Sequence, residues 1–180
     1  MIKYKVANRY SQALFEVGLE YNKLDKLLND LEVFSELFTK NKEFKIVMET
    51  SAVSRDEKKS IIEELAKRFD FNPLTVNFFK LLIDKNKIKF ITTITEVFRK
   101  KYREHAGIAD YEIVSAIDLD AKIINEIKKK LEEKTGKKIE LTTKVKPEII
   151  GGLIIKTEGL IYDGSLKSHL LKIKEKILKG

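Results

Sequence analysis

The chain has 180 residues, no cysteine, and 36 lysines and arginines against 28 acidic residues, for a formal net charge of +8. This length allows one domain or two small ones, and a hydrophobic fraction of 43% is enough for a packed core. The lack of cysteine excludes disulfides and thiolate zinc sites.

Two features bear on membranes and secretion. The longest apolar run, 149–155, is far shorter than the roughly 20 residues that span a bilayer. The first ten residues have no apolar centre of the kind a signal peptide needs. We therefore expect a chain that is made and kept in the cytosol and reaches a membrane only through its partners.

The basic charge leaves three kinds of partner open: nucleic acid, an anionic membrane surface or an acidic protein. The densest basic patch combines Lys128, Lys129 and Lys130 with Lys134, Lys137 and Lys138. It has no interleaved aromatic residues and no signature of a nucleic-acid-binding fold. Lysines elsewhere mostly alternate with acidic residues along helices, as on a solvated face. We favour the solvated face and keep a basic nucleic-acid-binding protein as the alternative function.

The first three predicted elements are helical. Residues 3–20 form the first helix, and Asn22 can cap the second. The second helix carries a stripe of apolar residues at three- and four-residue spacing: Leu24, Leu27, Leu28, Leu31, Phe34 and Phe38. A short helical piece follows around residues 41–48.

Start signals mark the next helices. Ser54 followed by Glu57 is a capping box that opens the fourth helix. Asn72 followed by Pro73 is a cap with proline at the first helical position, and it opens the fifth. The sixth runs from about residue 87 to 105. Six helices with short connections predict a six-helix bundle.

The periodicity changes at Gly107. Residues 109–115 alternate as a strand does, Asp120 caps a helix that Gly136 closes, and residues 139–145 alternate again. We therefore predict an α+β protein of two domains, with an N-terminal helical bundle over 1–106 and a small C-terminal α+β domain over 107–180.

The C-terminal segment contains glycines at structural positions. Gly151 and Gly152 lie within a dense apolar run, and we expect a positive φ where the chain enters a β-hairpin. Asp163, Gly164 and Ser165 then supply a turn and a cap for a last helix that ends near Leu178.

The first and fifth helices are apolar over more of their circumference than a surface helix requires. One explanation is that both are central in the bundle and buried on all sides. The other is that one edge of each lines a groove for a partner helix, where small residues allow close approach. The candidate groove residues are Ala7, Tyr10, Ser11, Ala13, Leu14, Phe78, Leu81 and Leu82, with Ser11 expected at the exposed edge.

Residues for catalysis are lacking. His105 and His169 are far apart in the sequence and have no partner spacing, so we expect surface residues. Neither Gly151-Gly152 nor Gly164-Ser165 lies in a phosphate-loop pattern, and no spacing of histidines or carboxylates indicates a metal site. We expect no catalytic residue, no metal and no cofactor, and no binding of ATP by this chain.

Three stretches, in this order, resemble one known family. They are Ala7–Glu16, Asn77–Ile88, and Pro147–Lys156 with the following Tyr162–Ser165. Together they resemble the delta subunit of bacterial F-type ATP synthases, a relative of the mitochondrial oligomycin-sensitivity-conferring protein. The chain departs from the family pattern at Lys167-Ser168-His169, where an Arg-Gly-Arg type of run is commoner.

The resemblance implies a non-catalytic subunit of the peripheral stalk, which resists rotor torque during ATP synthesis coupled to proton transport. It implies that the N-terminal bundle receives the N-terminal helix of the alpha subunit between its first and fifth helices. The C-terminal domain is expected to hold the b subunit. It further implies a single copy per complex, bound peripherally at the cytoplasmic face of the inner (plasma) membrane.

Overall fold

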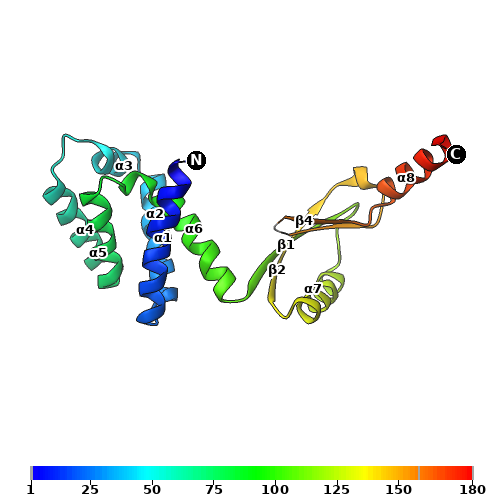
Figure 1. The fold of residues 1–180 in the computed structure, drawn as a ribbon, viewed down its shortest axis with the longest axis horizontal. Coiled ribbons are helices and arrows are strands. Elements are labelled where there is room, and N and C mark those ends of the chain that lie inside the picture. The colour runs from blue at the N-terminus through cyan, green and yellow to red at the C-terminus, as the bar shows by residue number, and fades with distance from the viewer. Residues whose placement is uncertain (1, 158, 180) are drawn as a thin grey trace. The chain divides into compact units, whose positions relative to one another are not determined.

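The structure is a computed structural model, and it describes residues 2–157 and 159–179. The chain divides into two compact units between Tyr102 and Arg103 (Figure 1). Arg103 is still helical, but its guanidinium pairs with Asp110 and Glu140 of the C-terminal unit. The division therefore falls a few residues before the change of periodicity at Gly107.

Helices form the N-terminal unit, and α4 and α5 begin at the signals predicted from the sequence. Their bounds are α1 Ile2–Glu20, α2 Leu24–Lys40, α3 Lys42–Glu49, α4 Arg55–Phe69, α5 Pro73–Asp84 and α6 Ile91–His105, the last preceded by a 3-10 turn, Ile88–Phe90. Ser54 and Glu57 form both bonds of the predicted capping box. Asn72 accepts from the backbone N–H of Leu74, and Pro73 takes the first helical position.

The prediction that Asn22 caps α2 is wrong. Asn22 has φ 52°, and the next N–H, that of Lys23, donates to the Gly18 carbonyl at 2.9 Å. This pattern closes the C-terminus of α1, where a left-handed residue is common and asparagine tolerates it. The chain then enters α2 through Lys23, which makes no side-chain cap bond.

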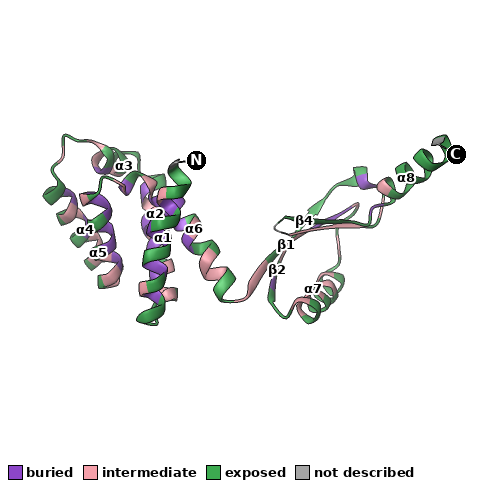
Figure 2. Cartoon of the chain, viewed as in Figure 1, coloured by how far each residue is buried: buried purple, intermediate pink, exposed green. Residues whose placement is uncertain are grey.

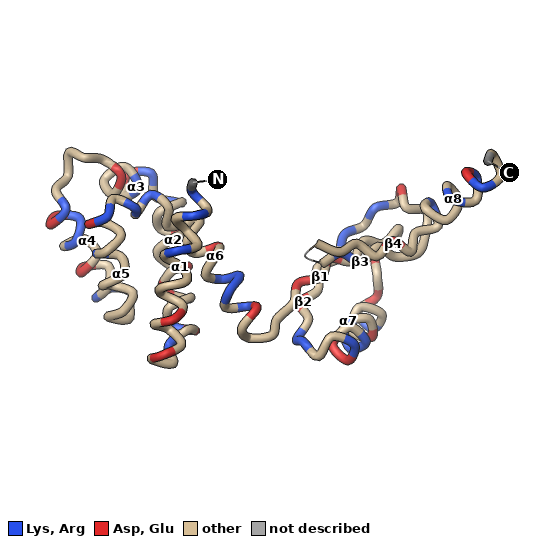
Figure 3. Tube along the Cα trace, in the orientation of Figure 1, with Lys and Arg blue, Asp and Glu red and all other residues tan. Residues whose placement is uncertain are grey.

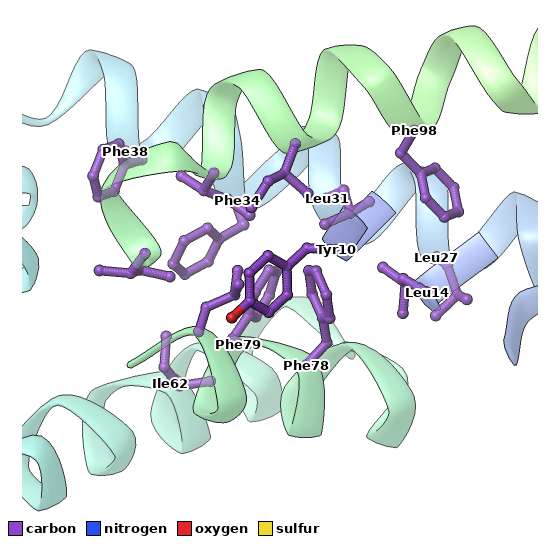
Figure 4. Close-up of a cluster of buried hydrophobic side chains, with 14 of the residues drawn as sticks. Tyr10, Leu14, Leu27, Leu31, Phe34, Phe38, Ile62, Phe78, Phe79 and Phe98 are labelled. Carbon is purple, nitrogen blue, oxygen red and sulfur yellow. The ribbon is translucent and has the colours of Figure 1, made fainter. Parts of the chain in front are cut away.

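Buried residues are concentrated in the N-terminal unit (Figure 2), and its core contains a cluster of aromatic side chains (Figure 4). The rings of Phe34 on α2 and Phe79 on α5 stack with centroids 4.1 Å apart. Phe34 also touches Phe38 and Phe44, and Phe79 touches Phe71. Pairs of this kind add about 0.5–1.5 kcal/mol each beyond the area they bury, so α2 and α5 are firmly joined.

A four-stranded sheet forms the centre of the C-terminal unit. The elements are β1 Ile108–Ser115, α7 Ala121–Thr135, β2 Lys138–Val145, a 3-10 turn Pro147–Ile149, β3 Leu153–Thr157, β4 Leu160–Asp163 and α8 Leu166–Lys179. The strand order is β2-β1-β3-β4. Strands β1 and β2 are parallel and joined through α7, whereas β3 pairs antiparallel with both β1 and β4.

The predicted caps and hairpin of this unit are present. Asp120 accepts from the N–H of Lys122 at the start of α7, and Gly136 ends that helix at φ 67°. Strands β3 and β4 form the hairpin. The buried apolar core is small, consisting of Ile113, Val114, Ile139 and Ile149. Much apolar surface of this unit is therefore left uncovered within the chain itself.

Candidate functional site

The inner face of α1 packs against α6. Ser11 has no exposed surface, and its hydroxyl donates to the Ile94 carbonyl at 2.7 Å. The rings of Phe15 and Phe98 meet edge to face, with centroids 5.8 Å apart. Ala7 is also fully buried. The expectation that Ser11 lies at an exposed edge is therefore wrong, because its side chain satisfies its polar group inside the core.

Another side of α1, the one that carries Tyr10, contacts α5. Tyr10 is 9% exposed, and its ring lies edge-on to Phe78 of α5, with centroids 6.5 Å apart (Figure 4). Ala13 and Val17 follow Tyr10 by three and seven residues and lie on the same side of α1. Ala13 is exposed and Val17 is half-buried. Leu14, at 4% exposure, packs inward.

Helix α5 presents a matching edge. Leu74 precedes Phe78 by four residues and Leu81 follows it by three, so the three side chains share one side of the helix. Leu74 is half-buried and Leu81 is 43% exposed, whereas Leu82 is fully buried.

We call six of these residues the α1/α5 strip: Tyr10, Ala13, Val17, Leu74, Phe78 and Leu81. The strip is apolar and partly open to water, and it joins the two helices where Tyr10 meets Phe78. Five of the eight predicted groove residues lie on it or beside it. The other three, Ala7, Ser11 and Leu82, are fully buried.

A charged side chain lies against the α1/α5 strip at Tyr10. The guanidinium of Arg9 is 5.1 Å from the centre of the Tyr10 ring. On the side of α5 that faces α4, away from the strip, Lys80 pairs with Glu63 at 2.5 Å, and its hydrogen bond and charge lower the pKa of the Glu63 carboxyl. This ion pair therefore joins α4 to α5 and leaves the apolar residues of the strip uncovered.

In the C-terminal unit, the structure brings together the glycines and the turn that the sequence singled out. Gly152 has φ 77°, and a Cβ on it would lie 2.2 Å from the Gly164 carbonyl oxygen. The N–H of Gly164 donates to Leu153, and the N–H of Leu166 donates to Gly151, both at 2.9 Å. Gly151 does not have a positive φ, so of the pair only Gly152 meets that expectation.

The same turn starts α8. Asp163 accepts from the N–H of Ser165 at 2.9 Å and from the hydroxyl of Ser168 at 2.7 Å. These bonds, with that of Ser168 the strongest influence, lower the pKa of Asp163 to about 2. Ser165 is buried, and its hydroxyl accepts from the N–H of Ser168. Asp163 and Ser165 are therefore structural residues that attach α8 to the hairpin.

Helix α8 carries the most exposed apolar side chains of this unit. Each of Leu166, Leu170, Leu171, Ile173, Ile177 and Leu178 is at least half exposed. Lysines lie between them at Lys167, Lys172, Lys174 and Lys176, against one acidic residue, Glu175 (Figure 3). The sequence reasoning did not assign these residues a role. Their spacing at 166, 170, 173 and 177 is the helical signal that could have done so.

A hollow of about 560 Å³ lies where α8 begins. Its apolar lining comes from Val145, Ile149 and Ile154, and its polar lining includes Lys146, Glu148, Asp163, Lys167 and Ser168. The hollow therefore offers both apolar contacts and groups of either charge to a partner side chain.

Within residues 2–157 and 159–179, no cluster of histidine and carboxylate side chains could hold a metal ion. None of the helices in that described part is long and apolar enough to cross a membrane.

The fold is a helical unit followed by a small α+β unit, and each unit presents exposed apolar side chains on a helical face. Residues 6–177 match the family model described as ATP synthase delta (OSCP) subunit. The ATP synthase subunit delta of Trichlorobacter lovleyi is 35% identical over 180 residues, which is all of both chains. That of Carboxydothermus hydrogenoformans is 35% identical over 172 residues, or 96% of each chain.

The chain belongs to this family. It is a peripheral-stalk component of the F-type ATP synthase and is structural, not catalytic. A chain in the cryo-EM structure of the Toxoplasma gondii mitochondrial ATP synthase hexamer shares the fold, with a TM-score of 0.66 and 23% identity over 96% of this chain and 97% of that one. Family membership replaces the nucleic-acid-binding alternative.

Proposed function

We propose that this chain joins the alpha subunit to the b subunit and so helps the stalk to resist rotor torque. In this proposal the N-terminal helix of the alpha subunit lies on the α1/α5 strip, and the C-terminal unit holds the distal part of b. The chain acts as a single copy at the cytoplasmic face of the plasma membrane, which it reaches through its partners.

The observation that carries the N-terminal half is the contact between Tyr10 and Phe78 at the centre of a partly open apolar strip. A helix laid along it would cover Ala13 and Leu81, which now face water. Ala13 allows close approach because its side chain is a single methyl group. The burial of apolar surface supplies the affinity, at roughly 25 cal/mol per Å² before the costs of association.

The C-terminal half rests on α8. Its apolar side chains have little of their own unit to pack against, and its lysines outnumber its acidic residues. A partner helix that is apolar on one side and acidic along the borders of that side complements both properties. We propose that the b subunit supplies such a helix. A stable specific interface requires burial of about 1,200–2,000 Å² in total, so we expect the b subunit to cover α8 along its length.

We also propose that the two halves act as separate domains, a six-helix bundle over residues 1–106 and an α+β domain over 107–180. In an adaptor built in this way, one domain can lose its partner while the other domain stays folded and bound. This arrangement makes the two interfaces independently testable.

The test is titration of the full-length chain with an amphipathic N-terminal peptide of the alpha subunit. Ala13→Trp should weaken binding by about tenfold or more, equivalent to about 1.4 kcal/mol, with little change in the melting temperature. Asn8→Trp is the matched control, since Asn8 is exposed on α1 but lies away from the strip. Equal affinity for all three chains would show that the alpha subunit binds elsewhere.

A further inference from the structure

A carboxylate inside the N-terminal core is not used by either proposed interface. Asp30, on α2, has no exposed surface. Its Oδ2 accepts from the backbone N–H of Asn72 and from the hydroxyl of Thr75, both at 2.8 Å. Its Oδ1 lies 3.1 Å from Nζ of Lys26, one turn earlier on α2.

The donors to Asp30 belong to the start of α5. Asn72 is the cap of that helix and Thr75 lies in its first turn, so the carboxylate sits where unpaired N–H groups and the helix dipole favour a negative charge. Lys26 also donates to the carbonyl of Asp70, at the end of α4. Asp30 and Lys26 together hold both ends of the connection between α4 and α5.

Helix α2 packs against both helices of the strip. Leu27 lies close to Gly18 of α1, where a Cβ would be only 3.0 Å from Leu27 Cδ1. Two turns later on the same face of α2, Phe34 stacks on Phe79 of α5. The separation between α1 and α5 therefore depends on how each is seated on α2, in addition to the contact between Tyr10 and Phe78.

The ring stack joins α2 to α5, but a small shift of one helix along its axis costs little per contact, because each pair of atoms contributes only a small attraction. Two hydrogen bonds to one buried carboxylate oxygen are directional, and a shift of α5 would break them in a place water does not reach. Asp30 thus supplies the register that the ring stack does not.

We propose that Asp30 is a positioning residue for partner binding: it fixes α5 on α2 and thereby sets the spacing of the α1/α5 strip. The part of this inference that concerns partner binding rests on the proposed function. The effect of Asp30 on the position of α5 can be measured without any partner.

The first experiment measures that position in the full-length chain. The protein has no native cysteine, so Ala13→Cys with Leu81→Cys places one spin label on each helix without background labelling. Pulsed electron spin resonance should give a narrow distance distribution with Asp30 present. Asp30→Ala should broaden or shift it, and Thr75→Val, which removes one of the two bonds with little change in side-chain volume, should do so to a smaller extent.

A matched control separates positioning from general loss of stability. Met48, on α3, is 1% exposed and makes no bond to Asp30. Met48→Ala should lower the melting temperature yet leave the distance distribution narrow. Broadening of equal size in Met48→Ala and Thr75→Val would overturn the inference, as would an unchanged distribution in both Asp30→Ala and Thr75→Val.

The second experiment titrates the same variants, without labels, with the alpha-subunit peptide. Asp30→Ala should weaken binding by about tenfold or more and Thr75→Val by about threefold, whereas Met48→Ala stays near wild type. If Asp30→Ala does not fold, Thr75→Val carries the test alone. A third outcome is that Asp30→Ala broadens the distance distribution while the chain with Asp30 intact binds no peptide. That result would support positioning by Asp30 and reject the proposed alpha-subunit site.

Discussion

The hydroxyl of Ser11 donates to the carbonyl of Ile94 across the contact between α1 and α6, at 2.7 Å, with both residues fully buried. A polar group in the core is tolerated because this bond satisfies it. With the edge-to-face pair of Phe15 and Phe98, this contact packs one side of α1 against α6, so the proposed partner surface is on the Tyr10 side of the helix.

We predict that Ser11→Ala lowers the free energy of unfolding by about 0.5–1.5 kcal/mol, the net contribution of a typical hydrogen bond. Ser11→Trp should destabilise the unit by about 3 kcal/mol or more through overpacking. Chemical denaturation followed by circular dichroism measures both. A Ser11→Trp chain as stable as the wild type would contradict the buried position of this residue.

Gly152 combines a positive φ with a close backbone neighbour. Gly152→Ala should cost more than Gly136→Ala, because both positions are left-handed but only Gly152 would bring a Cβ against a carbonyl oxygen, that of Gly164. We expect about 1 kcal/mol for Gly136→Ala and about 3 kcal/mol or more for Gly152→Ala. Thermal denaturation of the two variants gives the comparison, and equal losses would mean that the contact with Gly164 relaxes freely.

The carboxyl of Asp163 should titrate with a midpoint near 2 in the folded chain, below its ordinary value of 3.8. Since the folded pKa is the lower one, the carboxylate stabilises the fold above about pH 4, and this contribution is lost as the pH falls toward 2. Nuclear magnetic resonance of the carboxyl carbon measures the midpoint. Ser168→Ala should raise it, because the Ser168 hydroxyl is the main cause of the lowered pKa.

A fragment of residues 1–106 should fold without the rest of the chain. The aromatic cluster around Phe34 and Phe79 lies wholly within it. Circular dichroism should show a cooperative, mostly helical melt, as expected of a small single domain. A disordered fragment would mean that the helical unit needs the C-terminal residues in order to fold.

Local signals predicted the caps well. The capping box at Ser54, the start of α5 at Asn72 and the end of α7 at Gly136 depend on a few adjacent residues, so their outcome follows from short-range chemistry. Asn22 shows the limit of this reasoning. Asparagine is common both at the start of a helix and in the left-handed conformation at its end. Here the bond from the N–H of Lys23 to the Gly18 carbonyl ends α1 at Asn22.

The candidate site was less predictable. Helical spacing correctly grouped Tyr10 with Leu14 and Phe78 with Leu82, but it does not say which side of each apolar arc faces the core. Ser11 is at one edge of the apolar arc of α1, and its burial depends on a partner, Ile94, that is 83 residues away in the sequence. The donors to Asp30 are also distant in the sequence, at Asn72 and Thr75, so local spacing does not indicate its role.

The apolar side chains of α8 also affect the solubility of the chain before it binds a partner. Leu170, Ile173 and Ile177 are in contact with water in every unassembled copy. Exposed patches of this kind attract one another as well as a partner, and pairing of two copies rises with the square of their concentration. An excess of this subunit over its partners therefore favours self-association through α8. Synthesis in proportion to the other subunits keeps the concentration of unassembled chains low.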